Sequence, residues 1–243
     1  MRVQTDLRFR WIVNISSPLM GGVLLLLLAI PLVSTAQEET LQIDGFSTGQ
    51  PVNFQAGFFT GEMGAVRLVP TLNCPCKLES ITLVYGGGTG TFNVGVHIWN
   101  DVGTVDPGSQ LFNGTSFLTG SNDSLNLIDL SAEDIEVNGP IRVGIEMLTI
   151  GTGGLPSLAT DVDGINAPAN FIYAFSLSLF DYEWKQSSDF GVSGDWIIRA
   201  TISEVAPAVP TFSLFGTAIL LSTLIATALI AVLRHQKHMR SHV

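Results

Sequence analysis

The chain has 243 residues, of which 13% are charged and 46% are hydrophobic, and its mean hydropathy is +0.40. Residues 37–205 contain 20 of the 21 acidic residues but only five of the 11 basic ones. Such an acidic surface repels phosphate backbones, which argues against nucleic acid as a partner. It suits an extracellular domain, because the acidic side chains favour solubility.

Residues 1–36 have the three parts of a secretory signal peptide. A basic start precedes an apolar stretch from Gly21 to Val33, and small residues follow at Ser34 and Ala36. The pattern predicts export, with cleavage between Ala36 and Gln37. The alternative is an uncleaved anchor, which the short apolar core disfavours, since a spanning helix needs about 20 apolar residues.

Residues 37–203 are predicted to form one all-β domain, a jelly-roll-like β-sandwich. Apolar side chains alternate along four runs and glycine or proline turns separate them, for example "GGGTG" (86–90) and "VDPGSQ" (105–110). The residues expected to face the core are Ile81, Leu83 and Tyr85; Phe92, Val94, Val96 and Ile98; Ile141, Val143, Ile145 and Met147; and Trp196, Ile198, Ala200 and Ile202.

We do not expect catalysis. His97 is the one histidine of this domain, and alternation predicts that its side chain points away from the core as a surface imidazole. No nucleophile elbow, zinc motif or phosphate-binding loop occurs. Carboxylate pairs for glycoside hydrolysis stay open, because such pairs form only in the folded chain.

Three features could bind a ligand or cross-link the chain. Aromatic residues near strand ends, which are Trp99, Tyr182 and Trp184, could form a platform for a polysaccharide, the alternative being core or rim packing. Asp161 and Asp163 in "DVDG" could bind structural Ca²⁺, although both are also ordinary turn residues. Cys74 and Cys76, the only cysteines, could form a small disulfide ring after export or stay as thiols.

The C-terminal region is predicted to anchor the chain in a membrane. A Pro/Ala-rich linker (204–211) precedes residues 212–233, which contain no charged side chain and are long enough for a transmembrane helix. Basic residues follow at Arg234, Lys237 and Arg240, so residues 234–243 are expected to be cytoplasmic and the domain to lie outside.

The segment "VPTFSLFG" (209–216), the apolar run and the basic end together resemble the IPTL-CTERM signal, a bacterial C-terminal sorting signal of the PEP-CTERM-like class. The usual motif is I-P-T-L-S-E-W-G, and Pro210, Thr211, Ser213 and Gly216 match it. The resemblance implies that a membrane-embedded sorting peptidase recognises and cuts the tail. Permanent single-pass anchoring is the alternative.

Several phrases also resemble, in order, a recurrent sandwich domain of bacterial secreted proteins. They are "CPCKLESITL", "VHIWND", "DPGSQL", "LSAEDIEVNGPIRVGIE" and "GDWIIRATI". The first hypothesis is therefore an exported, non-enzymatic surface module that acts in adhesion or matrix contact. The alternatives are a carbohydrate-binding or carbohydrate-cleaving domain and a Ca²⁺-stabilised module without another cofactor.

Overall fold

A computed structural model describes residues 36–149, 154–176, 179–205 and 214–240. The predicted signal peptide therefore lies, except for Ala36, outside the described residues. Ala36 and Gln37 precede the first strand, and the Gln37 carbonyl accepts a hydrogen bond from the Glu204 N–H at the end of the last strand.

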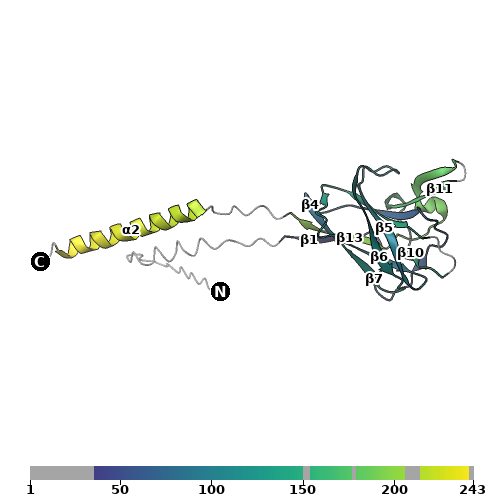
Figure 1. Ribbon diagram of the computed structural model, residues 1–243, viewed down its shortest axis with the longest axis horizontal. Helices are drawn as coiled ribbons and strands as arrows, with labels where there is room; N and C mark the ends of the chain where they lie inside the picture. The colour runs from purple at the N-terminus through teal and green to yellow at the C-terminus, as the bar shows by residue number, and fades with distance from the viewer. Residues whose placement is uncertain (1–35, 150–153, 177–178, 206–213, 241–243) are drawn as a thin grey trace, which may run out of the picture. The chain divides into compact units, whose positions relative to one another are not determined.

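The domain consists of two antiparallel sheets, which confirms the predicted all-β sandwich (Figure 1). One sheet has the order β1-β13-β4-β10-β2, with β7 and β8 also paired to β4. Its strands are β1 (Glu38–Leu41), β2 (Asn53–Phe54), β4 (Cys76–Gly86), β7 (Leu125–Asp129), β8 (Glu136–Val137), β10 (Ser157–Thr160) and β13 (Ile198–Glu204).

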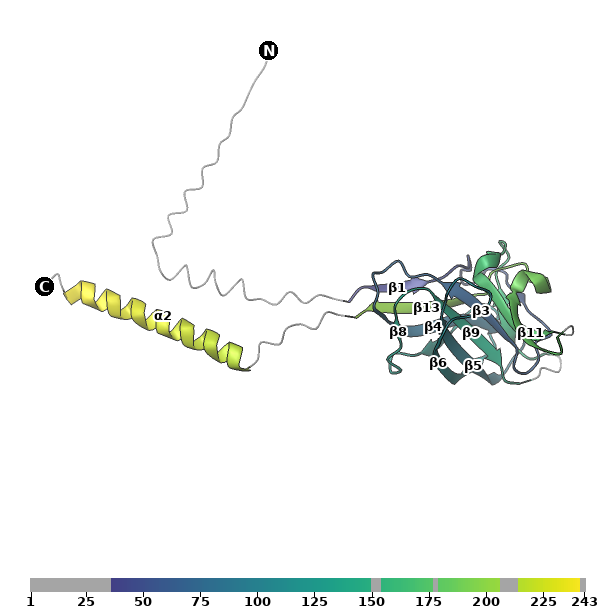
Figure 2. The same cartoon turned by 90° about the horizontal axis from the view of Figure 1, so that it is seen from above.

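The second sheet has the order β12-β11-β3-β9-β5-β6, and several of its strands can be followed side by side in Figure 2. Its strands are β3 (Met63–Leu68), β5 (Thr91–Asn100), β6 (Gln110–Thr119), β9 (Ile141–Met147), β11 (Asn170–Ser176) and β12 (Asp181–Gln186). Two short 3-10 helices, η1 (Ala167–Ala169) and η2 (Ser187–Phe190), flank β11 and β12.

The core lies between the two sheets, and it includes the side chains that alternation predicted together with others from the remaining strands and loops. All four predicted runs contribute to one cluster of packed apolar residues, in which Trp196 is fully buried and Phe92 is partly buried. Alternation succeeds because successive side chains of a strand point to opposite faces and each sheet covers one face of the other.

The chain crosses between the two sheets of the sandwich at most steps. The "GGGTG" turn makes one of these crossings, from β4 to β5. Gly87 and Gly90 have φ angles of +78° and +109°, a region that side chains rarely tolerate. These glycines therefore permit the tight turn that the sequence predicted.

The C-terminal helix α2 runs from Leu214 to Arg240, past the predicted boundary at residue 233. It includes Gly216 and the basic residues Arg234, Lys237 and Arg240. The predicted transmembrane helix 212–233 is not found: among the described residues, no helix is both long and apolar enough to cross a membrane.

Candidate functional site

The outer face of the six-stranded sheet carries a cluster of aromatic rings. The β11–β12 register places Tyr173 opposite Trp184 and Phe175 opposite Tyr182. Directly opposite side chains in an antiparallel pair lie on the same face and contact each other. Alternation along "NFIYAFS" therefore puts Tyr173 and Phe175 on the outer face, and β12 adds two more rings beside them.

The rings contact one another in a continuous series. Tyr173 stacks on Tyr182 with centroids 5.5 Å apart and an interplanar angle of 24°. Phe175 meets Tyr182 edge-on at 5.6 Å, and Trp184 lies 5.2 Å from Tyr173. Trp99 of β5 meets Trp184 edge-on at 5.5 Å. We call the residues Tyr173, Phe175, Tyr182 and Trp184 the aromatic face.

The structure thus brings together the three residues predicted as a platform, but it corrects the role of Trp99. Trp99 is only 9% exposed, whereas Tyr182 and Trp184 are half-buried. A Cβ atom added at Gly144 of β9 would lie 2.8 Å from Trp99 Cζ3. Trp99 therefore lies flat over a glycine on the neighbouring strand, where it supports Trp184 and is covered itself.

A buried ion pair supports the aromatic face from below. Arg142 has no exposed area, and its guanidinium carbon lies 3.6 Å from the centroid of the Phe171 ring and 5.5 Å from that of Trp184. Its Nε and Nη2 donate to Asp101 Oδ2 at 2.9 and 2.7 Å. Burial lowers the pKa of Arg142, and the adjacent Asp101 carboxylate counters that shift.

His97 is covered, contrary to the prediction of a surface imidazole. Its side chain lies on the outer face as expected, yet the residue is only 9% exposed because its ring stacks on Trp99 at 5.3 Å. Gln110 Nε2 lies 3.2 Å from Nδ1 and Glu146 Oε2 lies 2.8 Å from Nε2. If Gln110 donates, then Nε2 carries the proton and donates to Glu146, which fixes the ring orientation.

The sequence analysis missed Tyr173, Phe175, Glu146 and Gln110. The signal for the two rings is present in "NFIYAFS", where aromatic residues alternate along a strand. Gly95 and Gly144 also mark the face, since glycine inside a strand often indicates close approach of another group. An added Cβ at Gly95 would lie 2.6 Å from Glu146 Oε2.

Every basic residue of the β-domain contacts an acidic side chain. The pairs are Arg67–Asp101, Lys77–Asp134, Arg142–Asp101, Lys185–Glu183 and Arg199–Asp44. The remaining acidic residues leave this part of the chain with a strong negative charge. A neutral ligand therefore meets less electrostatic opposition here than an anionic one.

The predicted calcium residues lie in a loop after β10. Asp161 is buried, and its two oxygens accept backbone N–H bonds from Asp195 and Gly45 at 2.8 and 2.9 Å, while Asp163 is exposed. Within the described ranges, no group of three or more acidic, histidine or cysteine side chains could hold a metal ion. The backbone contacts give Asp161 a structural role in joining three loops.

We expect Asp161 to make stability depend on pH. Burial, together with the neighbouring Asp163, raises the pKa of Asp161 from 3.8 to about 6 in the folded state. The contribution of Asp161 to the free energy of unfolding is therefore largest at pH values below the pKa that this group has in the unfolded chain. It is lost as pH rises through about 6. Asp161→Asn removes this titration.

Urea unfolding of both proteins across about pH 4 to pH 7 measures the effect. The stability of the wild type relative to Asp161→Asn should fall over this range. A difference between the two proteins that stays constant with pH would contradict the assignment. Asp163→Asn is a useful companion, because it removes one cause of the shift and keeps the Asp161 carboxyl.

The other predicted site residues lie away from the aromatic face. Cys74 and Cys76 form a disulfide at the start of β4, so the thiol alternative is not observed. Of the sorting-motif residues, Pro210, Thr211 and Ser213 lie outside the described residues, and so does most of the predicted 204–211 linker.

No protein-family model matches the sequence, and no curated protein matches it either. Solved structures similar to the chain include two of a clostridial cysteine protease. The cysteine protease and lectin-like domains of Cwp84, a surface layer associated protein of Clostridium difficile, match with 15% identity and a TM-score of 0.41. That match covers 69% of this chain and 36% of the other.

A variant of the clostridial cysteine protease Cwp84, after propeptide cleavage, matches with 14% identity and a TM-score of 0.43. The match covers 69% of this chain and 40% of the other, so this chain spans less than half the length of either solved structure.

Proposed function

We propose that this chain is an exported, non-catalytic surface module that binds an uncharged polysaccharide on the aromatic face. The observation that carries the proposal is the row of half-buried rings, Tyr173, Tyr182 and Trp184, on the outer face of the sheet. Contact with a matrix polysaccharide would give such a module its role in adhesion.

The chemistry of the aromatic face suits sugar rings. One side of a pyranose ring presents C–H groups, which carry partial positive charge and pack against the negative face of an aromatic ring. Binding sites for such ligands combine apolar rings with a few fixed polar groups. The Tyr182 hydroxyl donates to the Thr60 carbonyl at 3.1 Å, which fixes the position of that ring.

Two of the carboxylates near these rings, Asp101 and Glu146, are engaged in contacts with cationic or histidine side chains, which favours binding without cleavage. Glycoside hydrolysis requires two carboxyl groups that share one groove, one to donate a proton and one to act as nucleophile or base. Asp101 contacts Arg67 and Arg142, and Glu146 contacts His97. Both carboxylates are thus engaged in holding the face together.

Export is supported by the sequence pattern of residues 1–36. The Cys74–Cys76 disulfide fits this location, because disulfides persist in oxidising compartments outside the cytoplasm. Processing by a sorting peptidase rests on the resemblance of residues 209–216 alone, and intact mass of the protein recovered from its native host tests it.

Replacing Tyr173 by alanine removes the ring that contacts both Tyr182 and Trp184 in the aromatic face. Polysaccharide binding should weaken about two- to twelvefold, because one aromatic contact contributes about 0.5–1.5 kcal/mol. Affinity electrophoresis through gels that contain neutral glucans, mannans or galactans measures the dissociation constant. An acidic polysaccharide such as alginate serves as the anionic comparison.

Leu127→Ala is the matched control, since Leu127 is 66% exposed on β7 of the other sheet. The Leu127→Ala variant should migrate through the polysaccharide gels as the wild type does. Wild-type protein that no neutral polysaccharide retards, or equal retardation of the Tyr173→Ala variant, would refute the proposed function.

A further inference from the structure

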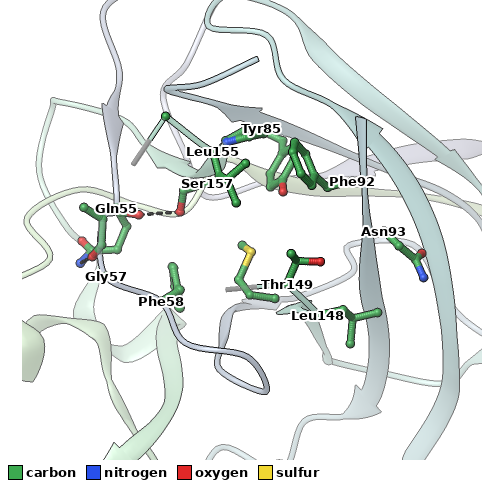
Figure 3. Close-up of a pocket in the computed structure, with 14 residues that line it drawn as sticks. Gln55, Gly57, Phe58, Tyr85, Phe92, Asn93, Leu148, Thr149, Leu155 and Ser157 are labelled. Carbon is green, nitrogen blue, oxygen red and sulfur yellow. Dashed lines mark hydrogen bonds between the residues drawn. The ribbon is translucent and has the colours of Figure 1, made fainter. Parts of the chain in front are cut away.

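A pocket of about 210 Å³ lies beside the loop that follows β2. Figure 3 shows side chains from several elements around it, including Gln55 and Phe58 of that loop, Tyr85 of β4, Phe92 of β5 and Leu155 before β10. Ligand pockets for drug-sized molecules have volumes of about 300–1,000 Å³. This pocket therefore suits a smaller ligand, of about the size of one six-membered ring.

The walls of the pocket are fixed by close backbone contacts. A Cβ atom added at Gly88 of the glycine turn would lie 2.2 Å from the Gly154 carbonyl oxygen and 2.5 Å from the Leu155 carbonyl carbon. Next along the chain from Leu155, the Ser157 hydroxyl donates to the Gln55 carbonyl, and the Gln55 N–H donates to the Leu158 carbonyl. The pocket is thus built into the fold and does not depend on side chains alone.

Tyr85 contributes a hydroxyl group to the lining of this pocket. The residue is only 3% exposed, and its side chain points toward the pocket (Figure 3). Burial raises the pKa of Tyr85, and no hydrogen bond within the described part of the chain offsets that effect. The hydroxyl makes no hydrogen bond to the described residues and its oxygen is not fully buried, so a ligand in the pocket can bond to it in place of water.

The remaining lining defines the chemistry of the ligand. Phe58, Phe92 and Leu155 offer apolar surface, and Thr149 places a hydroxyl at the exposed rim. No Asp, Glu, Lys or Arg is among the described residues that line the pocket. An ion would therefore lose its hydration without gaining a counter-charge. A hydrocarbon would leave the Tyr85 hydroxyl without a partner.

We propose that this pocket binds a single uncharged sugar residue, with its C–H groups against Phe58, Phe92 and Leu155 and a sugar hydroxyl hydrogen-bonded to Tyr85. The site is distinct from the aromatic face, although the same loop touches both: Gln55 and Phe58 line the pocket, and the Thr60 carbonyl accepts the Tyr182 hydroxyl. The sugar is either free or the end residue of a glycan.

Saturation-transfer NMR on the full chain tests the proposal, with a panel of methyl hexopyranosides as probes. Wild-type protein should transfer saturation to the ring protons of at least one of them. Tyr85→Phe, which keeps the ring and removes the hydroxyl, should weaken binding about tenfold. Leu155→Trp, which fills the pocket, should abolish it. Both variants should melt cooperatively, as the wild type does.

Tyr173→Ala separates this site from the aromatic face, and competition by an oligosaccharide on the wild-type protein identifies the source of the sugar. Free methyl hexopyranosides should bind this variant as they bind the wild type, even if polysaccharide binding is lost or was never present. If an oligosaccharide competes with the methyl glycoside on wild-type protein, the pocket takes chain ends; if it does not, the pocket takes the free sugar.

Three outcomes would overturn the proposal. They are the lack of transfer to any hexopyranoside, unchanged binding by both Tyr85→Phe and Leu155→Trp, and transfer to cyclohexanol with none to the sugars. The last result would assign the pocket to a weakly polar apolar ligand.

Discussion

Replacing Asp101 by alanine is expected to lower the free energy of unfolding by about 3–5 kcal/mol, because the change leaves a buried charge without its partner. Arg142 has no exposed area, and two of its nitrogens donate to Asp101 Oδ2. Asp101 also contacts Arg67 at 3.0 Å. The Val105 and Thr104 carbonyls would still accept from Arg142, but they carry no net charge.

Urea unfolding followed by circular dichroism measures this loss. Asp106→Ala is the matched control, since Asp106 lies on the same loop and is exposed, and it should change stability by less than about 0.5 kcal/mol. Adding Arg142→Met to Asp101→Ala should restore part of the lost stability, because an apolar side chain needs no counter-charge. A loss below about 1 kcal/mol for Asp101→Ala would show that water reaches the guanidinium.

Replacing Trp196 by alanine is expected to cost about 3–5 kcal/mol, as is typical for a large aromatic side chain removed from a core. Trp196 is fully buried, its ring centroid lies 6.0 Å from that of Phe58, and a Cβ at Gly64 would lie 3.2 Å from its Cε2. Its Nε1 donates to the Phe171 carbonyl and to Ser187 Oγ. The residue therefore joins β11 and η2 to the core.

Thermal and urea unfolding of Trp196→Ala and Trp196→Phe separate the two contributions. The phenylalanine variant keeps most of the apolar contact and loses the Nε1 bonds, so it should be less destabilised than the alanine variant. Equal stability of Trp196→Ala and wild type would mean that the core closes around the cavity, contrary to the close packing at Gly64.

The strands and the core could be predicted because they depend on local alternation. The side chains of "IRVGIEM" and "TFNVGVHIW" repeat every second residue, and that period alone decides which side faces the other sheet. The order of the strands follows from pairing between distant segments. Nothing local in "KLESITLVY" indicates that β4 lies beside β13, β7, β8 and β10.

The candidate site was only partly predictable for the same reason. Trp99 and Trp184 are separated by three intervening strands in the sheet, and only the folded arrangement brings their rings together. His97 was expected on the correct face, but three neighbouring side chains cover it. They are Trp99 on β5, Gln110 on β6 and Glu146 on β9. Burial of an outward-facing side chain depends on such neighbours and not on alternation.

The pairing of β13 has a mechanical consequence, which bears on the surface module proposed above. β13, the last strand of the domain, has seven residues and is bonded on one side to β4 and on the other to the four residues of β1. Hydrogen bonds in an antiparallel pair run perpendicular to the strands. Tension applied along β13 from its Glu204 end therefore loads these bonds in shear, many at once, and does not open them one by one. The domain is built to resist a pull at its C-terminal end.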